Sequence, residues 1–318
     1  MLKILRTTCA VLLFGAALDA TAGCGTAFCS LNTDWSTHGA QAEPGGRFDL
    51  RYEFIDQDQL RAGTRKVGVG EIPSHHDEVR TINRNLIAAF DYTFNARWGI
   101  AASLPAVSRD HEHIHNHQGE AFHDSWSFAR LSDARITGRY SFDRDSSSPG
   151  TGNFGIQFGI KLPTGQYELA NAEGDIAERT LQPGTGTTDA LAGVFYSTTS
   201  AGGTGWFADA TLLAPMAERA GYKPGTRLGV DVGASYPWKN RLSLLLQVNA
   251  QWKDRDSGLN AEPEDTGGTY LHLSPGVEVS VGDKTRLYGF VQIPIYQYVN
   301  GVQLAADWSI AAGLSRRF

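Results

Sequence analysis

The sequence predicts an all-β fold, a single transmembrane antiparallel up-and-down β-barrel of about twelve strands. In the stretch 302–318, apolar and polar residues alternate with a period of two, which is typical of a β-strand with one apolar face. Similar stretches recur through residues 47–318, separated in turn by short turns and longer loops. Only 41% of residues are hydrophobic and the mean hydropathy is −0.27, as expected when lipid-facing residues alternate with polar ones. We therefore expect short periplasmic turns, long outer loops and a location in the bacterial outer membrane. The sheet should be closed, because a sheet in lipid can leave no edge unpaired.

Residues 1–22 are expected to be a secretory signal peptide. Lys3 and Arg6 precede an apolar stretch at 11–18, and Ala20-Thr21-Ala22 matches an A-x-A cleavage site. A transmembrane anchor is the competing interpretation, but this apolar run is too short to span a bilayer.

Residues 23–46 are expected to form a periplasmic segment with a disulfide between Cys24 and Cys29, since paired cysteines are common in oxidising compartments. A metal site is one alternative, whereas the spacing lacks the His of a covalent haem site. Another alternative is a lipid-modified Cys24, because residues 21–24 loosely resemble a lipidation box. The rest of the segment shows no sustained period, so it either enters the barrel mouth or remains a solvated leader.

Residues 47–318 are expected to form the barrel. The alternating segments fall, in chain order, at 48–54, 86–94, 98–104, 136–142, 154–162, 190–196, 206–212, 228–236, 242–252 and within 271–318, which turns near 282 and 300. Short turns near 95, 146, 202, 239 and 283 alternate with longer loops at 58–79, 108–127, 163–187, 214–226 and 254–268. The terminal Phe318 is typical of the signal that the barrel assembly machinery recognises, and parity places Trp308 against outer-membrane lipid.

Two motifs resemble a known family. The stretch Gly159-Ile160-Lys161-Leu162-Pro163-Thr164-Gly165 and, after it, Leu181-Gln182-Pro183-Gly184-Thr185-Gly186 resemble elements of the outer-membrane barrels grouped as the MetA-pathway of phenol degradation family. The runs 273–277 and 292–296, followed by Asn300-Gly301, resemble its closing hairpins. The similarity covers roughly residues 130–318, and it implies an outer-membrane barrel with a transport role but no substrate or catalytic residues. The paired cysteines and the histidines described next depart from the family's general pattern.

A histidine-rich stretch is the sharpest candidate site. His111, His113, His115 and His117 alternate within one predicted loop, and Glu120, His123 and Asp124 follow. Imidazole suits Zn, Cu and Ni, and carboxylates can complete the ligand set or orient the rings, so we expect a divalent metal site here. The alternative is a solvated loop that binds metal only adventitiously.

Charged residues of both signs fall on the polar face of the predicted strands and should line the lumen. They form either an ion-pair network that stiffens the wall or a polar path for a small solute. The predicted set is Arg51, Asp91, Arg135, Arg139, Lys161, Asp189, Asp231, Arg241, Arg286 and Asp307.

These features favour an outer-membrane channel or transporter for small-molecule solutes, with a metal-binding external loop. The alternative is a surface protein that captures or senses metal on a closed barrel. Enzymatic activity is not expected, since no Ser-His pairing, phosphate loop or H-E-x-x-H helix can be recognised. A nucleic-acid partner is not expected either, because 28 basic residues face 34 acidic ones.

Overall fold

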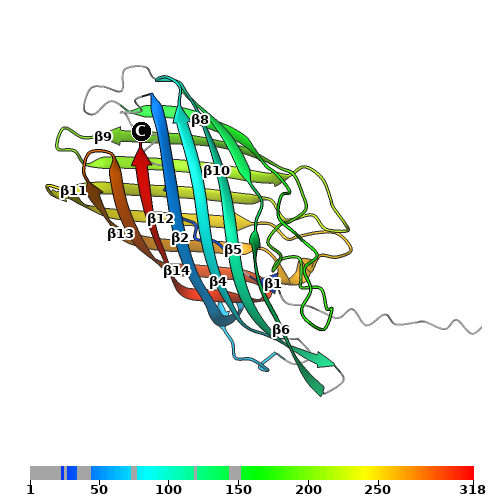
Figure 1. Ribbon diagram of the computed structural model, residues 1–318. Coiled ribbons are helices and arrows are strands. Elements are labelled where there is room, and N and C mark those ends of the chain that lie inside the picture. The colour runs from blue at the N-terminus through cyan, green and yellow to red at the C-terminus, as the bar shows by residue number, and fades with distance from the viewer. Residues whose placement is uncertain (1–22, 25–26, 34–43, 73–76, 118–119, 143–151) are drawn as a thin grey trace, which may run out of the picture.

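The computed structural model describes residues 23–24, 27–33, 44–72, 77–117, 120–142 and 152–318, which form an antiparallel β-barrel (Figure 1). The predicted signal peptide lies outside the described residues. The strands are β1 (Gly23–Cys24), β2 (Gly45–Gly63), β3 (Arg65–Lys66), β4 (Asp77–Thr93), β5 (Trp98–His117), β6 (Glu120–Leu131), β7 (Arg135–Ser141), β8 (Asn153–Lys161), β9 (Asp189–Thr199), β10 (Gly205–Pro215), β11 (Arg227–Lys239), β12 (Leu242–Lys253), β13 (Gly268–Val281) and β14 (Thr285–Arg317). The described helical structure is one short 3-10 turn, Pro263–Asp265. None of the described residues belongs to a helix long and apolar enough to span a membrane.

Closure comes from β14, which pairs with strands on both of its sides. Residues 285–299 pair with β13, and residues 299–317 pair with β2, on the far side of a bend at Asn300 and Gly301. Eleven of the described strands therefore close the wall, and β14 contributes two legs to it. Counting those legs separately gives the twelve strands that the sequence predicts.

The wall is apolar outside and polar inside, as in a membrane barrel. On β11, for example, Leu228, Val230 and Val232 are exposed, whereas the alternating Asp231 and Gly233 face inward and are less accessible. Aromatic rings gather near the connections 94–97 and 142–152, where Trp98 packs on Tyr140 at 4.8 Å between centroids. This is the girdle expected at a membrane interface. We call this end, which carries the short connections, the turn end, and the opposite end the loop end.

The predicted loop 108–127 is instead a β-hairpin. Strands β5 and β6 pair from Ala106 opposite Leu131 to His117 opposite Glu120. The sequence predicts a loop here because the stretch is rich in histidines and acids. The structure instead continues the backbone pairing of β5 and β6 beyond the part of the barrel that the other strands form. Residues 106–117 of β5 pair with β6, and residues 98–103 of β5 pair with β7. Residues 132–134, between β6 and β7, belong to neither strand and form an irregularity in the wall.

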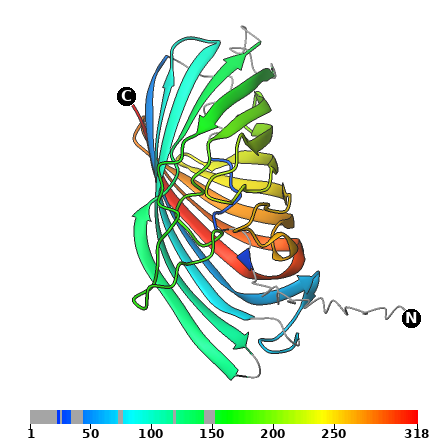
Figure 2. The same cartoon turned by 90° about the vertical axis from the view of Figure 1, so that its right-hand side faces the viewer.

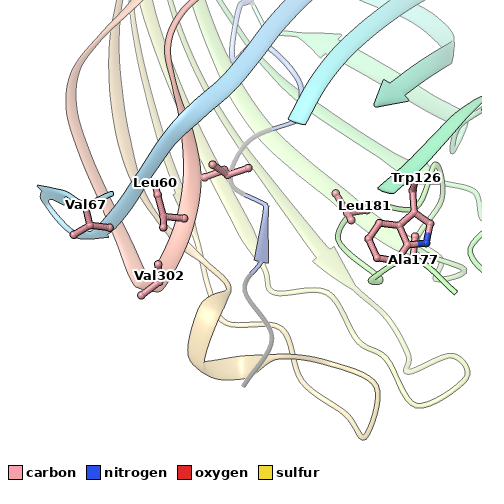
Figure 3. Packing of buried hydrophobic residues seen from close by; sticks show 7 residues of the cluster. Leu60, Val67, Trp126, Ala177, Leu181 and Val302 are labelled. Atoms are coloured by element: carbon pink, nitrogen blue, oxygen red, sulfur yellow. The ribbon is translucent and has the colours of Figure 1, made fainter. Parts of the chain in front are cut away.

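The long connection 162–188 lies across the barrel opening at the loop end, where Figure 2 shows it in green. Its Leu181 and Ala177 pack beside Trp126 of β6, while Leu60, Val67, Val302 and Leu304 form the other part of the same buried cluster (Figure 3). The indole Nε1 of Trp126 donates to the Asp175 carbonyl at 2.9 Å. The loop is thus held against the wall by packing as well as by hydrogen bonds.

Candidate functional site

Residues 27–33 lie inside the barrel, where they contact several neighbouring strands of the wall. The Cys29 amide donates to Glu53 of β2 at 3.2 Å, and its thiol donates to Ser309 of β14 at 3.3 Å. The Asn32 amide donates to Gln247 of β12 at 3.2 Å, and Gln247 returns a bond to the Asn32 carbonyl at 2.9 Å. We call residues 27–33 the plug. Of the two placements left open by the sequence, the structure has the one inside the barrel.

The plug also packs through a few apolar side chains. Cys29 and Leu31 are buried with Ile55, Leu245 and Phe290. The Cys29 sulfur is buried, and burial raises the pKa of its thiol well above the ordinary range. The side chain of Cys24 lies outside the described residues, although its backbone pairs with Leu304. The Cys24–Cys29 disulfide therefore stays a prediction.

Five of the predicted lumen charges form buried ion pairs, four of them between different strands. Arg139 on β7 pairs with Asp91 on β4 through both carboxylate oxygens. Lys161 on β8 lies 3.0 Å from Asp189 on β9. Arg51 donates to Thr33 of the plug at 2.7 Å and lies 3.0 Å from Glu53. These contacts belong to the wall network, one of the two predicted interpretations.

Four more of the predicted lumen residues differ in their position and contacts. Asp231 accepts from Asn249 at 2.6 Å, and Arg286 lies 3.5 Å from Glu278 beside a small cavity at the turn end. Arg135 faces inward, since it shares parity with the buried Arg139, and it is exposed to solvent. Arg241 lies in the turn between β11 and β12, beyond both strands.

Asp307 is a correction to the predicted lumen set. It is exposed and forms an ion pair with Lys66 of β3 at 2.8 Å. The ladder between β14 and β2 is irregular from Ala305 to Ser309, so an extra residue shifts the alternation at this point. Beyond the irregularity parity is restored, and Trp308 and Ile310 are exposed on the outer face as predicted.

Asp133, in the irregularity between β6 and β7, fastens the long loop to the wall. Its carboxylate accepts from the Gly165 amide, the Thr185 amide and hydroxyl, and Lys161 Nζ, each at 3.0 Å. Gly165 and Gly184 touch through their backbones, because a Cβ on Gly184 would lie 2.4 Å from the Gly165 carbonyl oxygen. The two family-like motifs thus meet at one buried carboxylate, which we call the Asp133 latch.

The first two predicted metal ligands are buried inside the loop end. His111 Nε2 lies 3.5 Å from His113 Nδ1, and His113 Nδ1 lies 3.7 Å from Glu178 of the long loop. His111 Nδ1 also lies 2.8 Å from the Thr81 hydroxyl. Both rings pack near Trp126. They are therefore part of the packed interior of the loop end.

The β5–β6 ladder shows where the other predicted ligands lie relative to one another. Asp124 is opposite His113, and Glu120 is opposite His117, whereas His123 is opposite Ile114 and so has the opposite parity to His113. The side chains of His115, His117 and Glu120 lie outside the described residues. Within the described part of the chain, no three His, Cys, Asp or Glu side chains are grouped to hold a metal ion.

Glu178 lies near these histidines, and Glu262 of another loop is within electrostatic range of Glu178; sequence patterning singled out neither residue. Burial, together with Glu262 and Glu78, raises the pKa of Glu178 well above its usual range. Burial, together with Glu78 and Asp265, raises the pKa of Glu262 to about 9. Both glutamates lie in loops that are far apart in sequence, so only the tertiary structure brings them together. The role of Asp133 could not be predicted from the sequence for the same reason.

Comparison with solved structures identifies the fold. An outer-membrane channel from Pseudomonas putida superposes with a TM-score of 0.66 at 11% identity, covering 91% of this chain and 99% of that chain. The NanC porin gives a TM-score of 0.46 at 8% identity, covering 85% of this chain and 100% of the other. The translocator domain of the autotransporter NalP from Neisseria meningitidis gives 0.44 at 12%, covering 89% and 92%. No family model and no curated protein matches the sequence, so the MetA-pathway resemblance stays a prediction.

At such low identities the likeness concerns the fold alone. The closed barrel, its apolar exterior and this likeness together make the chain a bacterial outer-membrane β-barrel. The predicted fold class and location are confirmed.

Proposed function

We propose that this chain is an outer-membrane channel for small solutes and that the plug controls passage through it. The supporting observation is the plug itself, which sits among polar wall side chains such as Gln247, Gln292 and Glu53. Individual hydrogen bonds of this kind contribute about 0.5–1.5 kcal/mol net, because water can replace them. A segment held mainly by replaceable bonds can leave the lumen without unfolding the wall.

A designed disulfide tests whether the plug must move. In a Cys24→Ser background, Ser309→Cys puts a second sulfur where a hydroxyl now lies 3.3 Å from the Cys29 sulfur. Oxidation should tie the plug to β14 and lower conductance in a planar bilayer, and a reducing agent should restore it. Ser309→Ala in the same background is the matched control and should respond to neither reagent.

Two results would contradict the proposal. The first is no conductance in any state, including after reduction of the disulfide. The second is equal conductance in the oxidised and reduced states once mass spectrometry confirms that the disulfide has formed. Heat-modifiable migration of each variant on gels checks that the barrel has folded.

A metal role for the histidines is a second proposal. It is supported by the approach of His113 to Glu178, which joins the β5–β6 hairpin to the long loop. Ligand histidines must be neutral, so Zn affinity should fall as the pH drops below about 6.5. Titration of the folded barrel with Zn should give a stoichiometry near one that is lost when His111 and His113 become alanine. Several weak, equivalent sites would mean adventitious binding instead.

A further inference from the structure

Three arginines at the loop end face one region without a carboxylate partner. Within the described residues, Arg135 of β7, Arg179 of the long loop and Arg227 of β11 form no ion pair within 4.0 Å. Other basic lumen residues do form such pairs, as Arg51 does with Glu53, Arg139 with Asp91 and Lys253 with Asp256.

These arginines are near one another. Arg135 is opposite Lys161 in the β7–β8 ladder, and Lys161 donates to the hydroxyl of Thr185, whose carbonyl oxygen accepts from Arg179 at 2.8 Å. Arg227 is opposite Lys253 in the β11–β12 ladder, and Lys253 and the Tyr222 hydroxyl both bind the Asp256 carboxylate. The Arg179 guanidinium stacks between two rings, 4.6 Å from the Tyr167 centroid and 4.7 Å from the Tyr222 centroid. Tyr222 therefore links the arginine of the loop to that of the wall.

Three of the four carboxylates nearby already form ion pairs with lysines. Asp133 and Asp189, the acids within range of Arg135, both bind Lys161 at 3.0 Å. Asp256, next to Tyr222, binds Lys253 at 2.6 Å. Glu168, within range of Arg179, is also within range of Arg219.

The region therefore keeps a positive charge after these pairs are counted. Lys161 balances one of its two aspartates, so the three arginines leave a surplus of about two charges. Arg135 is exposed to solvent, whereas Arg179 and Arg227 are half-buried. The surplus can consequently be reached from the lumen.

We propose that Arg135, Arg179 and Arg227 form a binding site for a small organic monocarboxylate. A guanidinium donates two parallel hydrogen bonds to a carboxylate, and this geometry is the strongest interaction such a site can offer. A surplus of about two charges amid four carboxylates suits a single negative charge better than a highly charged anion. This site names the class of solute for the proposed channel and so builds on that function, but its occupancy can be measured without conductance.

Calorimetric titration of the whole detergent-folded protein with sodium butyrate tests the site. Butyrate should bind saturably, and uncharged 1-butanol should not. Arg135→Gln and Arg227→Gln should each weaken butyrate binding at least tenfold. Arg135→Lys, which keeps the charge but loses the planar fork, should fall between wild type and Arg135→Gln. The matched control is Arg84→Gln, because Arg84 pairs with Asp110 at 2.5 Å on the outward parity of β4 and should stay within twofold of wild type.

Several outcomes would overturn the site. They are unchanged butyrate affinity in the Arg135→Gln/Arg227→Gln double variant, equal binding of 1-butanol, and inorganic phosphate binding as tightly as butyrate. Planar-bilayer recordings separate this inference from the channel. Arginine-dependent butyrate binding without conductance rejects the channel and keeps the site. Conductance without arginine-dependent binding rejects the site alone.

Discussion

Replacing Asp133 by alanine should release the long loop while leaving the barrel wall intact. The substitution removes four accepted hydrogen bonds, two of them from the backbone amides of Gly165 and Thr185. Lys161 keeps Asp189 at 3.0 Å, so no buried cation loses its last partner. The loss of a buried acceptor that binds several donors is worth about 3 kcal/mol. That energy corresponds to about a hundredfold increase in the population of the open loop.

Hydrogen exchange followed by mass spectrometry measures this opening directly. Amides in 163–187 should lose about a hundredfold of their protection, whereas those of β10 to β12 should keep theirs, because local opening need not involve the wall. Asp175→Ala is the matched control, since Asp175 lies in the same loop and contacts Trp126 through its backbone carbonyl. Unchanged protection of 163–187, or an equal loss throughout the barrel, would refute the role assigned to the Asp133 latch.

Three further changes have defined outcomes. Gly184→Ala should loosen the same loop in hydrogen exchange, because its Cβ would lie 2.4 Å from the Gly165 carbonyl oxygen, and equal protection would contradict this contact. The pKa of Glu262 is about 9 in the folded state against an ordinary 4.5, so the proton on its carboxyl group binds the folded state more tightly than the unfolded state. This contribution to folding stability is fully present below about pH 4.5 and is lost as the pH rises through 9. The melting temperature of Glu262→Gln should therefore fall less between pH 5 and 9 than that of wild type, and parallel curves would count against the shift. Val232→Arg, on the lipid face of β11, should destabilise the folded barrel by about 2–4 kcal/mol in urea titrations in lipid vesicles, and Val232→Thr should cost much less.

The alternation of residues was enough to predict the wall. Leu228, Val230 and Trp308 are exposed on the outer face and Asp91 and Arg139 lie inside, because side-chain direction in a strand depends only on local parity. Parity misplaced Asp307, where a bulge adds a residue that the alternation does not reveal. The sequence likewise predicts a loop in place of the β5–β6 hairpin, because the histidines and acids of the hairpin resemble a solvated segment.

The interior contacts could not be predicted in the same way. Asp133 contacts Gly165 and Thr185, which are 32 and 52 residues away, and Asn32 of the plug contacts Gln247, which is 215 residues away. Such pairings depend on barrel closure and on the path of the long loop, neither of which leaves a periodic signal. The sequence predicts that Arg135 faces the lumen. It does not show that the nearby Asp133 and Asp189 both bind Lys161, which leaves Arg135 without a carboxylate partner. Glu178 and Arg179 carried no sequence signal at all.

The unequal lengths of the strands determine how deeply the barrel can sit in its membrane. Among the described strands β6 pairs only with β5, so its other edge carries backbone groups that lipid could not satisfy. The hydrocarbon layer must therefore end near Ser132 and Lys161, where β7 and β8 stop. Strands β7 and β8 have 7 and 9 residues and are the shortest described strands of the closed wall, whereas a tilted strand needs about 9–11 residues to cross. The thinnest part of the wall thus sets the vertical position of the molecule, and the tall β5–β6 hairpin rises into the headgroup layer and the water beyond it.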